Sequence, residues 1–284
     1  MSYVKPDQLI DSLVEAGVAK ASLSIGQMLA RGTLAGAILA CATTFAFTAT
    51  LQTAVPIVGA ILFPVGFVMI VILGLELVTG SFALIPLALL ERRTTSLKML
   101  KNFFFVIVGH LLGCGVYLLL YVAVLTRMGT DSSDPMIAMI VGIAEARTTG
   151  YEAMGLSGVA LVVIKAILCN WMVTLGAVLA FTSTSTGGKI LAMWLPVTTF
   201  FALGFEHAVV NMFVIPAGIV LGADVTVGDW WVFNQLPVLG GNLLGGLTLT
   251  AALLYFSHRR RIATAVRDAD LDALVEPARE NARS

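Results

Sequence analysis

The sequence predicts an all-α integral membrane protein with six transmembrane helices, arranged as two inverted three-helix repeats in which the second and fifth helices are broken. Composition is the first observation: 58% of the 284 residues are hydrophobic and 12% are charged, whereas a typical soluble domain has about 25% charged residues. The second is the spacing of the charges, since Glu76 is the only charged residue between Arg31 and Glu91, and residues 230–257 contain none. Spans of about 20 apolar residues are long enough to cross a bilayer. An internal repeat, described below, is the third.

Residues 1–27 are expected to form a cytoplasmic N-terminal amphipathic helix. The segment KPDQLIDSLVEAGVAK is too polar for the core of a signal peptide. Its apolar side chains recur at helical spacing: Ile10, Leu13, Val14 and Val18. This spacing predicts a short helix lying at the membrane surface.

Residues 28–258 are expected to form the transmembrane transport domain. The apolar blocks divide into six crossings, roughly Gly32–Leu51, Val55–Leu90, Phe103–Leu125, Leu156–Phe181, Ile190–Leu221 and Trp231–Phe256. The second and fifth are too long for one plain helix, and each has a glutamate near its middle with glycine and proline nearby. That combination is typical of discontinuous transmembrane helices.

The two halves of the chain resemble each other. Gly-Leu-Glu at 74–76 precedes Ile-Pro at 85–86, and Gly-Phe-Glu at 204–206 precedes Ile-Pro at 215–216, which is 130 residues later. The third crossing contains GHLLG and the sixth contains GNLLG at nearly the same offset. Because each repeat has three crossings, the two repeats enter the membrane from opposite sides.

The connecting segments differ in charge. Basic residues lie after the second, fourth and sixth crossings: Arg92, Arg93, Lys98, Lys101, Lys189 and Arg259–Arg261. Acidic residues gather in the segments after the third and fifth: Asp131, Asp134, Glu145, Glu152, Asp224 and Asp229. The positive-inside rule therefore places both termini in the cytoplasm, with residues 259–284 as a cytoplasmic tail. The expected location is the inner (cytoplasmic) membrane.

The two breaks mark the candidate site, because backbone groups released at a helix break must be buried in protein or line a water-filled path. Glu76, Glu206 and His207 lie at the breaks, and Lys165 is the other charge deep within a crossing. Ionisable residues inside a membrane are functional candidates. Structural roles remain open: the glutamates could bond released backbone groups, Lys165 could extend to the interface, and His110 could bond a neighbouring helix.

The motifs FPVGFVMIVILGLELVTG, KAILCNWMVTLGAVLA, GFEHAVVNMFVIPAG and GGNLLGG resemble those of the formate/nitrite transporter family, over about Lys20 to His258. The resemblance implies an aquaporin-like fold, a homopentamer with one pore per protomer, and transport of small monovalent weak-acid anions such as formate, nitrite, hydrosulfide or short carboxylates. The implied partners are the anion, protons and the lipid bilayer. No cofactor, metal or nucleic acid is expected.

The resemblance also implies roles for individual residues. His207 is similar to the central pore histidine and Thr79 to the threonine of the broken second crossing. Beside them, our hypothesis for Glu206 is that it holds the second broken loop. Lys165 matches a vestibule base, and the pore-side asparagines are Asn170 and Asn242. The implied constriction residues are Phe63, Phe200, Leu77 and Val78.

Three positions depart from the family pattern. Many members have Phe where Val78 stands, which predicts a wider constriction and easier passage of acetate or lactate. Several have Asn where His110 stands, and Ser81 replaces a frequent Asn.

The hypothesis from these residues is passage as a neutral acid. Lys165 would gather the anion, a proton would join it, and the neutral acid would cross the apolar rings that exclude a bare charge. An aquaporin-like channel for neutral solutes would share the repeat, although NPA occurs nowhere in the sequence. A membrane enzyme is the other alternative, but the metal-binding spacings His-x-x-x-His and His-x-x-Glu-His are absent, and the spacing of Cys41, Cys114 and Cys169 matches no metal site.

Overall fold

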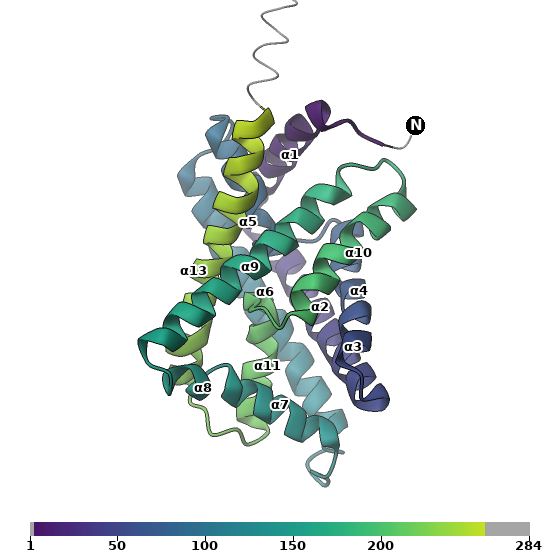
Figure 1. The fold of residues 1–284 in the computed structure, drawn as a ribbon, viewed down its shortest axis with the longest axis vertical. Coiled ribbons are helices and arrows are strands. Elements are labelled where there is room, and N and C mark those ends of the chain that lie inside the picture. Colours follow the sequence, from purple (N-terminus) through teal and green to yellow (C-terminus); the bar gives the residue numbers. More distant parts are fainter. Residues whose placement is uncertain (1–2, 259–284) are drawn as a thin grey trace, which may run out of the picture.

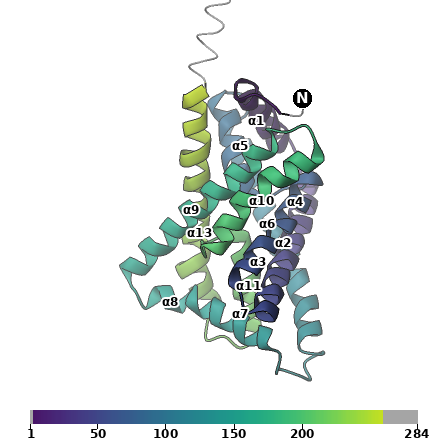
Figure 2. The same ribbon diagram turned by 45° about the vertical axis from the view of Figure 1, so that its right-hand side comes forward.

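The computed structural model describes residues 3–258, and over that range it is helical. The tail expected at residues 259–284 lies outside the described residues. Figures 1 and 2 show that the first helix and the end of the last one lie at the same end of the molecule, which is called the terminal side below. The opposite end, called the far side, carries the short helices α7 and α8.

The helices follow the predicted order of crossings. The first half contains α1 (Pro6–Ala21), α2 (Ile25–Thr53), α3 (Pro56–Leu62), α4 (Pro64–Ile72), α5 (Val78–Leu90) and α6 (Ser96–Leu125). The second contains α7 (Pro135–Ala146), α8 (Thr149–Glu152), α9 (Leu156–Ala180), α10 (Thr186–Ala202), α11 (Ala208–Val220), α12 (Val227–Asp229), the π-helical η1 (Trp230–Gln235), α13 (Leu236–Leu244) and the π-helical η2 (Gly245–Ala252).

Within residues 3–258, four continuous helices are long and apolar enough to span a membrane. They are α2, α6, α9 and the helix over Val227–His258 that joins α12, η1, α13 and η2. Shorter apolar helices, Pro56–Ile72, Val78–Leu90 and Ala208–Val220, belong to the broken crossings. The predicted fold class, an all-helical membrane protein, is confirmed.

The second and fifth crossings break at equivalent residues. Gly74 and Gly204, 130 residues apart, both adopt the left-handed region, with φ of 64° and 63°. A side chain there would be strained, so glycine lets each chain leave its helix at the same point. Figures 1 and 2 place α5 toward the terminal side and α11 toward the far side, as inverted repeats require. The second crossing has one further interruption, at Phe63, because Pro64 starts α4 without a backbone N–H.

Close contact between α2 and α6 depends on small residues. A Cβ atom added at Gly113 would lie 1.8 Å from the Thr33 carbonyl oxygen, and one at Gly36 would lie 2.6 Å from the His110 carbonyl oxygen. The two backbones therefore approach more closely than larger side chains would permit. This approach holds His110 beside the first break.

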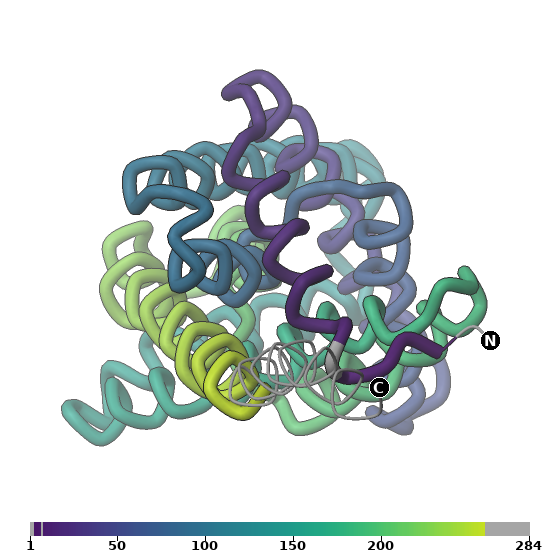
Figure 3. Tube along the Cα trace, turned by 90° about the horizontal axis from the view of Figure 1, so that it is seen from above, coloured from purple at the N-terminus to yellow at the C-terminus, as the bar shows by residue number. Residues whose placement is uncertain are grey.

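The N-terminal helix α1 lies across the terminal side of the bundle, as Figure 3 shows. Its apolar face, which includes Leu13 and Val14, is buried in a cluster with Leu84 and Leu87 of α5. The sequence predicted an amphipathic helix at the membrane surface; the helix is present, but its apolar face packs on protein. Lys20, near the end of α1, reaches the first break.

Candidate functional site

The two broken crossings meet inside the protein. Thr79 is the second residue of α5, and His207 is the residue that caps the start of α11. The Thr79 hydroxyl oxygen lies 3.2 Å from Nε2 of His207. Both side chains are buried. The contact therefore joins, inside the protein, the starts of α5 and α11, which are the half-helices that follow the two breaks.

The hydrogen bonds of His207 define its tautomer. Its Nδ1 accepts from the backbone N–H of Val210 at 3.3 Å, and a backbone N–H can only donate. The proton of the neutral ring therefore lies on Nε2 and points to the Thr79 oxygen. The hydroxyl hydrogen of Thr79 is then free to be donated to another group.

Equivalent side chains hold the first amide of each half-helix. The Val78 N–H donates to Nε2 of His110 at 3.1 Å, and the Nδ1 of that ring lies 2.8 Å from the Gly32 carbonyl oxygen. The Ala208 N–H donates to Oδ1 of Asn242 at 2.9 Å. Asn242 also donates to two carbonyl oxygens, those of Ala166 and Glu206, at 2.8 and 2.9 Å. His110 thus bonds a neighbouring helix, the structural role that its sequence position left open.

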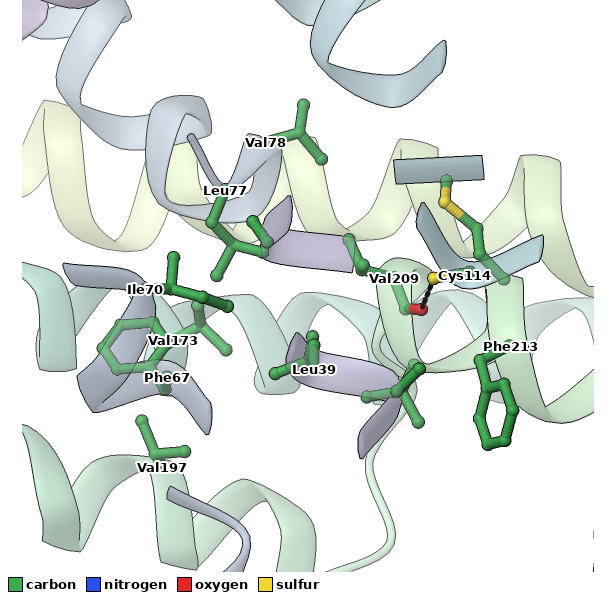
Figure 4. Packing of buried hydrophobic residues seen from close by; sticks show 14 of the residues in the cluster. Leu39, Phe67, Ile70, Leu77, Val78, Cys114, Val173, Val197, Val209 and Phe213 are labelled. Carbon is green, nitrogen blue, oxygen red and sulfur yellow. Dashed lines mark hydrogen bonds between the residues drawn. The ribbon is translucent and has the colours of Figure 1, made fainter. Parts of the chain in front are cut away.

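Asn170 and Cys114 occupy related places beside the next residue of each half-helix. Asn170 donates to the Thr79 carbonyl oxygen at 3.1 Å, and the Cys114 thiol donates to the Val209 carbonyl oxygen at 3.7 Å (Figure 4). The Asn170 Oδ1 atom is buried and has no hydrogen-bond partner within residues 3–258. An acceptor is thereby left open next to Thr79.

Each break also has a buried carboxylate. Glu206 accepts from the Tyr151 hydroxyl at 2.7 Å and from the side-chain amides of Asn211 and Asn234 at 2.8 and 3.3 Å. These bonds tie the loop of the second break to α8, α11 and the last helix. The hypothesis that Glu206 holds this loop is compatible with this geometry.

Glu76 has longer hydrogen bonds than Glu206, and it also makes one ion pair. Lys20 of α1 lies 2.9 Å from its carboxylate, while Ser81 and Asn102 lie 3.4 and 3.5 Å away. Ser81 stands where the second repeat has Asn211, and the shorter side chain makes the longer contact. The first break therefore depends on α1 for its strongest bond.

A cavity of about 430 Å³, the terminal-side vestibule, lies at the first break. Leu77, Phe67 and Ile70 form part of its apolar wall, and its polar lining includes Lys20, Arg31 and Glu76. Figure 4 shows the Leu77 side chain directed toward Ile70 and Phe67.

A second cavity of about 200 Å³, the far-side vestibule, lies at the second break. His207 and Arg147 line it together with an aromatic wall of Phe47, Phe200, Phe201 and Phe205. The rings of Phe200 and His207 stack with centroids 5.5 Å apart. Phe63 contacts Phe200 edge-on at 5.6 Å. The Thr79–His207 contact thus has apolar side chains beside it on the side of each vestibule.

Most of the residues proposed from the sequence come together at this centre. Two lie elsewhere. The Val78 side chain points away from Ile70 in Figure 4 and is buried outside both vestibule linings. The Lys165 ammonium donates to the Tyr151 hydroxyl at 3.2 Å, and the cation that lines the far-side vestibule is Arg147.

Sequence reasoning missed Lys20, Arg31 and Arg147. A signal for Arg147 was present, because it and Arg127 are the two basic residues in the mainly acidic segment between the third and fourth crossings. Lys20 was assigned to a surface helix, and nothing in the sequence shows that α1 folds back to the break. Within residues 3–258, no group of three or more His, Cys, Asp or Glu side chains could hold a metal ion.

Comparisons with known proteins agree with this architecture. The model of a family described as formate/nitrite transporter matches residues 7–256. The "Uncharacterized transporter YrhG" of Bacillus subtilis is 31% identical over 271 residues, covering 92% of this chain and 96% of the relative. The "Probable formate transporter" of Methanothermobacter thermautotrophicus is 33% identical over 254 residues, covering 84% and 91%.

Solved structures show the same fold. A chain titled "FNT family ion channel" superposes with a TM-score of 0.76 at 24% identity, covering 88% of this chain and 98% of that one. Another, titled "Pentameric formate channel with formate bound", gives a TM-score of 0.68 at 22% identity, covering 82% and 96%.

Proposed function

The chain belongs to the formate/nitrite transporter family, and from that premise we propose that it carries small monovalent weak-acid anions, such as formate, across the membrane as neutral acids. Like its family, it is a transporter of small anions and not an enzyme. The observation that carries the proposal is the Thr79–His207 contact at 3.2 Å, where two half-helices start between apolar walls.

The vestibules favour an anion and the centre disfavours one. Arg31 lines the terminal-side vestibule beside the Lys20–Glu76 ion pair, and Arg147 lines the far-side vestibule. Each vestibule thus has a guanidinium group in its lining that attracts negative solutes. Moving a bare carboxylate past Leu77 or Phe200 would cost far more than moving a neutral acid. Protonation removes that cost, so the species that crosses is the neutral acid.

Polar groups at the centre suit the neutral acid. The Thr79 hydroxyl hydrogen can be donated to a substrate oxygen, because the Thr79 oxygen accepts from His207. The acid O–H needs an acceptor, and the unpartnered Oδ1 of Asn170 is one. The positive ends of α5 and α11 also stabilise negative charge that develops on the substrate.

The assembly and orientation belong to the same proposal. A homopentamer with one pore in each protomer fits the similarity to the structure titled as a pentameric formate channel. A cytoplasmic-membrane location with both termini in the cytoplasm fits the basic segments on the terminal side, among them Arg92, Arg93 and Lys98.

Uptake by proteoliposomes tests the function. The purified full chain is reconstituted, and initial uptake of formate, nitrite, hydrosulfide, acetate, lactate and bicarbonate is compared with that of empty liposomes. We expect rapid uptake of at least one weak-acid anion, lost in His207→Ala and kept in the matched control His258→Ala at the membrane edge. Uptake of water or glycerol without any of the anions would instead support the neutral-solute channel.

A further inference from the structure

Arg147 has a fixed backbone but a partly free side chain. It follows the last residue of α7, and its carbonyl oxygen accepts from the Asn234 side-chain amide at 2.9 Å. Its side chain is 19% exposed and lines the far-side vestibule together with His207. A guanidinium group anchored in this way is held at the mouth of the second break.

The neighbouring carboxylate does not use up the guanidinium donors. Glu206 already accepts from Tyr151, Asn211 and Asn234, and the Arg147 Nε lies 3.8 Å from it, longer than a hydrogen bond. One Nη1 N–H of Arg147 is donated to the Asn211 side-chain oxygen. A guanidinium has five N–H donors, so several are left for a ligand in the vestibule.

The carboxylates near this group do not occupy its donors. Glu206 lies between Arg147 and Lys165, which reaches it through Tyr151. Glu145, two residues before Arg147, accepts from the Asp224 backbone N–H at 3.1 Å. Among the described residues, the Arg147 guanidinium therefore has no carboxylate at hydrogen-bond distance, and an anion in the vestibule can take that place.

We propose that Arg147 is the residue of the far-side vestibule that determines anion specificity, by binding planar oxyanions such as carboxylates and nitrite through paired N–H donors. This inference rests on the proposed anion transport. A guanidinium matches two oxygens of a planar oxyanion at once. Hydrosulfide offers a single sulfur atom, which is a weak acceptor and does not match the spacing of the paired donors. A lysine in the same place would act as a point charge and attract both anions alike.

Lys165 has a different role in this arrangement. Its ammonium donates to the Tyr151 hydroxyl, which donates to Glu206. Lys165 therefore positions Tyr151, and through it the carboxylate of the second break. Its removal is expected to affect formate and hydrosulfide to the same degree.

Selectivity measurements test the inference. Initial uptake of formate and of hydrosulfide is measured against concentration for wild type, Arg147→Lys, Arg147→Gln and the control Lys165→Gln. For Arg147→Lys we expect the half-saturating formate concentration to rise about 10- to 150-fold, as for one lost charge-assisted hydrogen bond, with that of hydrosulfide little changed. Arg147→Gln should weaken both. An unchanged formate-to-hydrosulfide ratio in Arg147→Lys, or a change of that ratio in Lys165→Gln alone, overturns the proposal.

A measurement on the wild-type chain tests the role of Arg147 if the variants fail to assemble. Phenylglyoxal modifies arginine, and mass spectrometry follows its reaction at Arg147 and at Arg127, whose side chain is 79% exposed. Formate and nitrite should slow the reaction at Arg147 but not at Arg127, and hydrosulfide should slow neither. Equal protection of Arg147 by hydrosulfide, or no protection by formate and nitrite, would contradict the proposed role of Arg147, even if the wild type transports anions. A wild type that transports no anion would contradict the proposed function instead.

Discussion

Replacing Thr79 with valine removes one hydroxyl and little else. The two side chains have nearly the same shape, and the site is fully buried, so the packing around α5 should persist. The Nε2–H of His207 loses its acceptor at 3.2 Å, and the substrate loses the donor that we assign to the Thr79 hydroxyl.

The size of the effect follows from that lost bond. Leaving a buried donor without a partner costs about 1–3 kcal/mol. If this cost falls on the crossing species, the rate drops by about 5- to 150-fold, since about 1.4 kcal/mol corresponds to a factor of ten. Formate uptake by proteoliposomes, normalised to the amount of assembled protein, measures the change. Thr79→Ser, which keeps the hydroxyl, should retain most of the flux.

A structural role for Thr79 would give a different pattern. Thr79→Val would then lower the yield or the thermal midpoint in detergent, while flux per assembled protein stayed at the wild-type level. Wild-type flux in Thr79→Val would refute the assignment of the hydroxyl as the central donor.

Three further predictions concern the supports of the site. Asn242→Leu should lower the free energy of unfolding in detergent by about 3 kcal/mol or more, because three buried hydrogen bonds are lost. His110→Asn should keep a near-wild-type thermal midpoint, because Asn offers the same kinds of acceptor and donor. Equal losses of stability in the two variants would contradict the equivalence of His110 and Asn242 in the two repeats. Gly113→Ala should destabilise the protein by about 1–3 kcal/mol, because the added Cβ clashes with Thr33. Gly115→Ala has open space around the added Cβ and should be neutral or stabilise the protein by up to about 1 kcal/mol. Thermal unfolding in detergent distinguishes the two outcomes. Leu77→Ala should raise acetate relative to formate uptake by widening the apolar wall of the terminal-side vestibule, and an unchanged ratio would show that Leu77 does not limit substrate size.

The broken crossings could be predicted from the sequence because their signals are local. Glycine, glutamate and proline recur at a fixed offset in two overlong apolar blocks, and Gly74 and Gly204 take equivalent left-handed conformations. His207 could be recognised as an ionisable residue at a break, and the resemblance supplied its partner Thr79, which the structure brings into contact with it. The match between His110 and Asn242 was visible in GHLLG and GNLLG, but their shared task of holding a half-helix start requires coordinates.

The features that the sequence did not predict depend on the direction of side chains and on contacts between residues that are far apart in the chain. Neighbouring residues of a broken loop can face opposite ways, so the sequence could not tell that Leu77 lines a vestibule and Val78 does not. The size limit predicted at Val78 is therefore better tested at Leu77. Lys20 reaches Glu76 from 56 residues away, and only the packing of α1 on α5 shows that it does.

Simultaneous recording of formate uptake and electrical current tests the central claim most directly. Proteoliposomes containing the full chain receive formate at a series of external pH values, with a solid-supported membrane reporting net charge. Passage as the neutral acid predicts that uptake increases as the external pH falls and that formate and a proton move together with little net current. Large formate-induced currents that do not change with pH would contradict it, because they would show that the bare anion crosses the apolar walls.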